Sequence, residues 1–82
     1  MNSLQESPAR RLSEVPFQER VEILGVTAAP DLLRRLFSLG VRPGAQVEVL
    51  RKAPLGDPLE VKIHETLLSI RSSEASTVLV GG

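Results

Sequence analysis

Four side chains in the second half of the chain could ligate a metal ion. Asp57, Glu60, His64 and Glu65 offer carboxylate oxygens and one imidazole, which are common ligands of divalent metals. If residues 59–65 form a strand, Glu60 and His64 share its outward face about 13 Å apart. That separation is too long for one ion, so we expect a solvated polar face and assign no metal ligands.

Catalytic chemistry has still less support. His64 is the only histidine, and its neighbour Glu65 would point to the opposite face of a strand. The chain has no cysteine, and no nucleophile, base and orienting group occur together in a recognisable pattern. We therefore predict no catalytic residues and no enzyme.

The composition also narrows the range of functions. The 82 residues are enough for one small domain, and ten basic residues balance ten acidic ones. Such a chain lacks the positive field that non-specific binding to nucleic acid or to anionic membranes requires, and its only aromatics are Phe17 and Phe37. No apolar stretch approaches the roughly 20 residues of a membrane span, and the N-terminus does not resemble a signal peptide. A cytoplasmic binding module is the expectation.

Two elements are predicted in the first half of the chain. Residues 1–11 are polar and lack apolar periodicity, so we expect a flexible arm that precedes a domain of residues 12–82. The β-branched segment RVEILGV, residues 20–26, predicts a strand. In residues 27–40 the period changes to that of a helix, which starts near Pro30 and places Arg34 and Arg35 on its outward face.

A tight corner should follow this helix. Gly40 occupies the position where a left-handed residue commonly ends a helix, and Val41 can fold back onto the last turn. Pro43 and Gly44 suit the two central positions of a type II turn. We assign Gly40, Pro43 and Gly44 to folding.

Four more strands and one helical turn complete the predicted fold. Strands are expected at residues 45–50, 59–65 and 67–71 with a hairpin turn near Glu65 and Thr66, then a helical turn in SSEAS and a last strand TVLV. About five short strands with one short helix between the first two predict a mainly β, SH3-like barrel. The helix would close one open end of that barrel.

Particular stretches of the sequence are similar to a known family. LGVRPG (39–44), PLGDP (54–58) and LSIRSSEASTVLV (68–80) together resemble the FeoA family of ferrous iron transport accessory proteins. The resemblance runs from about Leu12 to Val80. It implies a small cytoplasmic SH3-like domain, without enzyme activity or cofactor, that acts with FeoB, a membrane ferrous iron transporter carrying a GTPase domain. One departure is that HET stands where the family usually has a turn glycine, so Glu65 is expected to need a positive φ.

The resemblance makes contact with a partner protein the leading hypothesis, and two places qualify for it. The APLGDP loop, which contains Pro54, Leu55 and Asp57, carries an apolar residue that is either tucked over the barrel or offered to a partner. Arg34 and Arg35 either keep the helix soluble or anchor an interface. The alternative function is a metal-responsive regulatory module, because a similar SH3-like domain ends iron-dependent repressors of the DtxR type and binds a transition metal or a peptide there.

Overall fold

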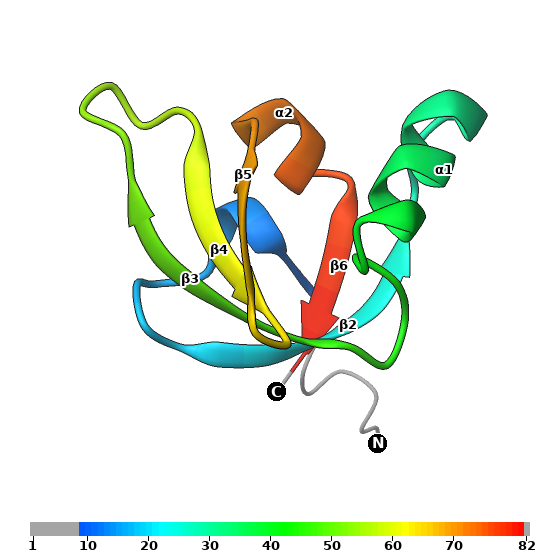
Figure 1. The fold of residues 1–82 in the computed structure, drawn as a ribbon, viewed down its shortest axis with the longest axis horizontal. Coiled ribbons are helices and arrows are strands. Elements are labelled where there is room, and N and C mark those ends of the chain that lie inside the picture. Colours follow the sequence, from blue (N-terminus) through cyan, green and yellow to red (C-terminus); the bar gives the residue numbers. More distant parts are fainter. Residues whose placement is uncertain (1–8, 82) are drawn as a thin grey trace, which may run out of the picture.

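The computed structural model describes residues 9–81 and contains one curled antiparallel sheet (Figure 1). The strands lie in the order β1-β6-β2-β3-β4-β5, so the sheet ends at β1 and β5 and is not closed. The elements follow along the chain as β1 (Arg10–Arg11), the 3₁₀ helix η2 (Leu12–Glu14), β2 (Arg20–Val26), α1 (Pro30–Ser38), β3 (Gln46–Lys52), β4 (Leu59–Ile63), β5 (Thr66–Ile70), α2 (Ser72–Ala75) and β6 (Val78–Gly81).

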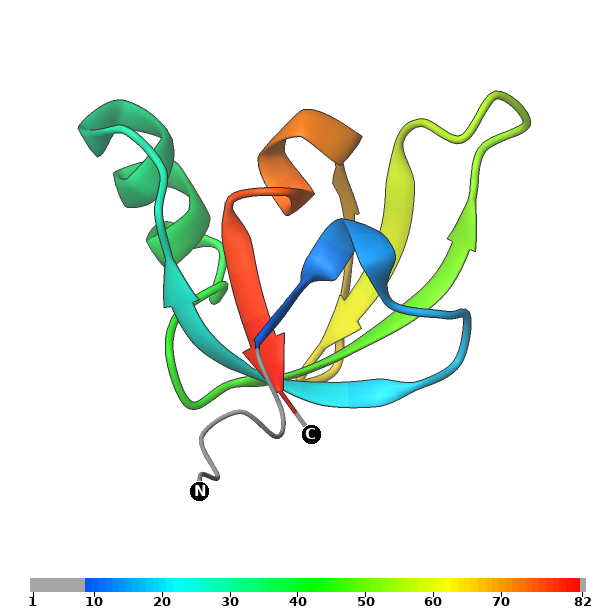
Figure 2. The same ribbon diagram turned by 180° about the vertical axis from the view of Figure 1, so that it is seen from behind.

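The curvature of the sheet comes from its two longest strands. The pairing of β2 with β6 shifts register between Ile23 and Gly25, and the pairing of β3 with β4 shifts between Val49 and Arg51. Such irregularities bend a strand and increase its twist. Figures 1 and 2 show the result from opposite sides, with the strands rising around a shared interior. The predicted mainly β, SH3-like fold is confirmed, with a sixth strand, the short β1, beyond the expected five.

The interior is packed with aliphatic side chains, as period-2 alternation along β2, β3 and β4 predicts. No buried polar or charged residue occurs among the described residues. The buried residues are Leu12, Val15, Val21, Ile23, Leu36, Val41, Ala45, Val47, Val49, Leu59, Val61, Ile63, Ile70, Ala75, Val78 and Val80.

The corner after α1 has the predicted geometry. The Gly40 N–H donates to the Phe37 carbonyl at 3.0 Å, and the Val41 N–H donates to the Leu36 carbonyl at 2.9 Å. Together with a φ of +97° at Gly40, these bonds form a Schellman motif, and Val41 is fully buried behind it. The turn that follows is closed by a 3.1 Å bond from the Ala45 N–H to the Arg42 carbonyl, with Gly44 at a φ of +94°.

The last two residues of the expected N-terminal arm form a short strand. Arg10 and Arg11 form β1 and pair with Val80 and Leu79 of β6. The Arg10 guanidinium also lies 2.5 Å from the Glu19 carboxylate, lowering the pKa of Glu19 through a hydrogen bond and raising the pKa of Arg10. Backbone pairing and an ion pair hold this strand, and neither leaves an apolar pattern in the sequence. Residues 1–8 of the expected arm lie outside the described residues.

The first helix does not close an end of the barrel as expected. In Figures 1 and 2 α1 stands at one side of the molecule. In contrast, α2 and η2 lie between the end of β2 beside α1 and the β3–β4 hairpin. Short connections tie α1 to the end of β2 and the start of β3, which are adjacent strands, so the helix stays beside them. Only Leu36 of its apolar face is fully buried, and Phe37 is half-buried.

The hairpin turn between β4 and β5 also differs from expectation. Ile63 pairs with Thr66, so the loop consists of His64 and Glu65 alone. The positive φ, +57°, falls on His64 and not on Glu65. Histidine tolerates the left-handed region better than most residues, which explains how the turn forms without glycine.

Candidate partner-binding loop

The loop between β3 and β4 is closed at its base by the chain itself. The Ala53 N–H donates to the Pro58 carbonyl at 3.0 Å, which extends the strand pairing by one step. The Gly56 N–H donates to the Ala53 carbonyl at 2.7 Å and forms a β-turn with Pro54 and Leu55 at its centre. Proline favours the first central position of such a turn because its φ is already fixed.

Contacts with α2 hold the C-terminal half of this loop. The Asp57 carboxylate accepts a 2.8 Å bond from the Ser72 N–H, and the Ser72 hydroxyl donates to the Gly56 carbonyl at 3.0 Å. The Arg71 guanidinium lies 3.7 Å from the second Asp57 oxygen. Asp57 therefore satisfies an amide at the start of α2, a capping role within the fold.

Leu55 stands at the tip of this fixed loop. Its side chain is 96% exposed, which is more than any other large hydrophobic residue among residues 9–81, the next being Leu67 at 60%. Leu55 therefore does not fold back over the barrel, and its contact with a partner stays a prediction. An exposed apolar side chain on an ordered loop can bury itself in a partner at little cost in loop ordering.

A shallow hollow of about 300 Å³ lies beside the loop and carries charges of both signs. Arg51 and Glu60 form an ion pair of 2.6 Å across its floor, whereas Lys52 belongs to no ion pair among residues 9–81. The hollow is lined by Arg51, Lys52, Ala53, Pro54, Pro58, Glu60 and Ser69. Pro54, the neighbour of Leu55 in the turn, thus lies next to a hollow with charged walls, and apolar contacts in interfaces commonly have a polar rim.

The two helix arginines lie apart from this loop and have partners within the chain. Arg34 pairs with Asp31 one turn earlier on α1, at 2.6 Å. Arg35 pairs with Glu74 and so links α1 to α2. Both side chains are more than half exposed, and exposed pairs of this kind contribute little to stability.

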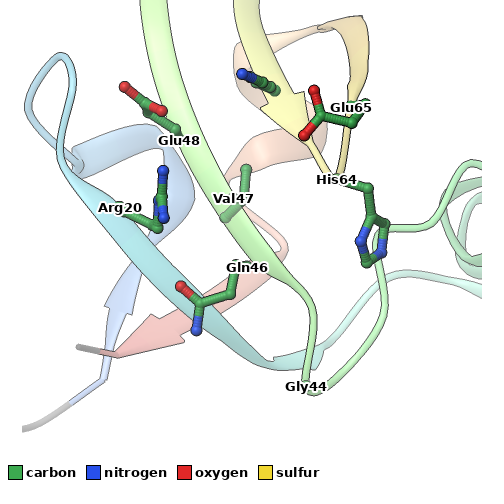
Figure 3. Close-up of a pocket in the computed structure, with 8 residues that line it drawn as sticks. Arg20, Gly44, Gln46, Val47, Glu48, His64 and Glu65 are labelled. Carbon is green, nitrogen blue, oxygen red and sulfur yellow. The ribbon is translucent and has the colours of Figure 1, made fainter.

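The four residues first considered as metal ligands do not converge. Within residues 9–81 there is no group of three or more histidine, aspartate or glutamate side chains placed to hold an ion. Asp57 contacts α2, Glu60 pairs with Arg51, and Figure 3 shows His64 and Glu65 pointing in different directions from the hairpin turn. The second hollow, of about 260 Å³, lies between that turn and the outer face of β2 and β3, with Arg20, Gln46 and Glu48 on its walls (Figure 3).

Comparison with known proteins settles the family. The sequence model of the FeoA domain matches residues 10–81. The chain belongs to the FeoA family. This match begins at Arg10, the first residue of β1.

Solved FeoA structures resemble this chain along most of its length. A FeoA protein from Chlorobium tepidum is 44% identical, with a TM-score of 0.83, and the match covers 88% of this chain and 69% of that one. A zinc-complexed FeoA from Stenotrophomonas maltophilia, described as an SH3 domain protein, is 37% identical with a TM-score of 0.77, and the match covers 88% and 89% of the two chains.

The fold also occurs in a regulator. A manganese-dependent transcriptional repressor superposes with a TM-score of 0.83 over 93% of this chain and 42% of its own, at 22% identity. Identity this low establishes a shared fold and carries no argument about metal sensing. Among the described residues there is also no helix long and apolar enough to cross a membrane.

The contacts that hold the candidate loop were not predicted from the sequence. Ser72 is the first residue of α2 and donates to the loop through its N–H and hydroxyl. The available signal was Asp57 in GDP, because an aspartate carboxylate is a strong acceptor for the free amides at the start of a helix. Its pairing with Ser72 depends on the sheet bringing positions 57 and 72 together.

Proposed function

We propose that this FeoA-family chain is a cytoplasmic accessory protein of ferrous iron uptake, and that it acts by contact with the FeoB-type transporter rather than by catalysis. Its family membership supports the link to ferrous iron transport. The FeoB-type transporter is proposed as the partner because the family resemblance implies it.

The exposure of Leu55 is the observation that carries the location of this contact. A large aliphatic side chain on a loop held at both ends by hydrogen bonds suits the centre of an interface, where a few buried side chains supply most of the binding energy. Pro54 lies beside it in the same turn and adds apolar area without rotamer freedom. Asp57 contributes by holding the loop, while Arg34 and Arg35 lie outside this contact.

The test is a binding assay with the intact transporter in detergent. Wild type, Leu55→Ser and the control Leu24→Ser are compared; Leu24 is also an exposed leucine, at 51%, but lies on β2. We expect Leu55→Ser to weaken binding by about tenfold or more and Leu24→Ser to leave it near the wild-type value. Equal binding by all three proteins would remove the loop from the contact, and no binding by wild type would refute the proposed function.

A further inference from the structure

The free edge of β5 carries features that neither the fold nor the loop requires. The sheet ends at β5, and beyond its pairing with β4 this strand has no second strand neighbour among residues 9–81. Figure 1 shows it at the front of the molecule, below α2. An unpaired strand edge offers a row of backbone donors and acceptors to an added strand.

The two sheet edges are protected differently. The opposite edge, β1, is two residues long and consists of arginines, which is a common way to prevent edge pairing. In contrast, β5 has five residues, TLLSI, with no charge and no proline, and its Leu67 is 60% exposed. This edge is therefore available for pairing.

The hairpin turn fixes which backbone groups face outward. In a two-residue hairpin the residues that flank the loop, here Ile63 and Thr66, form a hydrogen-bonded pair, and such pairs alternate along the ladder. Thr66, Leu68 and Ile70 thus bond to β4, whereas Leu67 and Ser69 turn their N–H and C=O groups outward.

We propose that β5 pairs antiparallel with β5 of a second copy of this chain, with Leu68 on the two-fold axis. In this register Leu67 lies opposite Ser69 of the other copy, and Ser69 lies opposite its Leu67. The outward-facing N–H and C=O groups of Leu67 in each copy then face those of Ser69 in the other copy. Both copies use the same surface, as a two-fold interface requires.

Charge favours this register and a second copy as the occupant. The same alignment places Glu65 of each chain opposite Arg71 of the other. None of the ion pairs within residues 9–81 includes Glu65. The Arg71 side chain is 66% exposed, and its one ion-pair contact within residues 9–81 is the 3.7 Å contact with Asp57. Opposite charges at facing positions stabilise a strand pair, and symmetry supplies the contact twice.

Single cysteines test the register, because the chain has none of its own. Cα atoms of a non-hydrogen-bonded facing pair are about 4.5 Å apart, within disulfide range, so Leu68→Cys should cross-link readily on oxidation. The matched variants Leu67→Cys and Ser69→Cys should not, since each cysteine would lie about 8 Å from its copy. Faster cross-linking at position 67 or 69 than at 68 would overturn the proposed pairing.

Sedimentation equilibrium up to about 1 mM protein tests the association without a core substitution, since one short strand edge makes a small and weak interface. We expect wild type to dimerise, Glu65→Arg to weaken the dimer by about tenfold, and Glu65→Arg combined with Arg71→Glu to restore it. A wild type that stays monomeric across this range would refute the proposal, as would a Glu65→Arg variant that dimerises like wild type. Neither result depends on transporter binding.

Discussion

Gly40 is the single residue on which the corner between α1 and β3 depends most directly. Its φ of +97° is a conformation that a β-branched residue adopts only with strain. A Cβ added there would meet only a side-chain methyl of Ile63 at 3.7 Å, an ordinary contact, so the cost of substitution lies in the backbone.

We predict that Gly40→Val lowers the free energy of unfolding by about 1–2 kcal/mol. Thermal unfolding followed by circular dichroism measures this. The control is Gly25→Ala, because Gly25 has no positive φ and a Cβ there would meet nothing within 4 Å. An unchanged Tm in Gly40→Val would contradict the Schellman assignment.

A second prediction concerns Glu19 and pH. The hydrogen bond from Arg10 lowers the pKa of Glu19 in the folded state, so the ionised carboxylate stabilises the protein above the unfolded pKa of about 4.3. This contribution disappears as the pH falls through the lower, folded pKa. We expect Glu19→Gln to melt below wild type at pH 7 and the gap to narrow in acid. If the difference in Tm between the two proteins is unchanged at a pH where Glu19 is protonated, the carboxylate charge does not stabilise the fold.

Among the secondary structure elements, the one-turn helix α2 stabilises the candidate loop. Its four residues are too few to be stable alone, and the Asp57 carboxylate supplies the acceptor for its first amide. The loop and α2 therefore order each other, across 15 residues of sequence.

We predict that Asp57→Ala costs about 1 kcal/mol of stability, as the loss of a helix cap does, and speeds amide exchange at Ser72 and Gly56. Hydrogen exchange followed by NMR measures the local effect. Asp57→Asn, which keeps an acceptor oxygen, should retain most of the protection. If exchange at Ser72 is the same in Asp57→Ala as in wild type, the loop is not held by this bond.

The elements whose determinants are local were predictable from the sequence. Strand alternation identified β2, β3 and β4, and proline and glycine at fixed offsets identified the start of α1 and the corner after it. The elements that depend on long-range pairing were not. β1 exists because β6 lies beside it, and the capping role of Asp57 exists because α2 follows β5 back to the loop.

The candidate site was predictable to the same degree. The sequence identified Leu55 as the notable residue of the loop, but its exposure depends on whether the barrel offers a cavity to receive it. Arg34 and Arg35 show the same limit, since the link from Arg35 to Glu74 joins residues that are 39 positions apart. Residue type alone did not separate a fold contact from a free surface.

On the scale of the whole molecule, the loop at one end of the β3–β4 hairpin is held in place and also carries an exposed apolar side chain. The sheet and α2 hold the base of the loop, its tip presents one exposed leucine, and a hollow with charged walls lies beside it. The β5 edge adjoins this surface, because Ser69 also lines the hollow beside the loop and Arg71 contacts Asp57. Leu55 and Glu65 belong to only one surface each, so substitutions at these two residues test the surfaces separately.

The most direct test of the central claim is a methyl NMR titration of leucine-labelled protein with the intact, purified transporter. We predict that the Leu55 methyl signals broaden or shift first while those of Leu24 keep their positions, because only the loop tip enters the contact. Changes confined to Leu24 or to the leucines of α1, with Leu55 unaffected, would contradict the assignment of the contact to this loop.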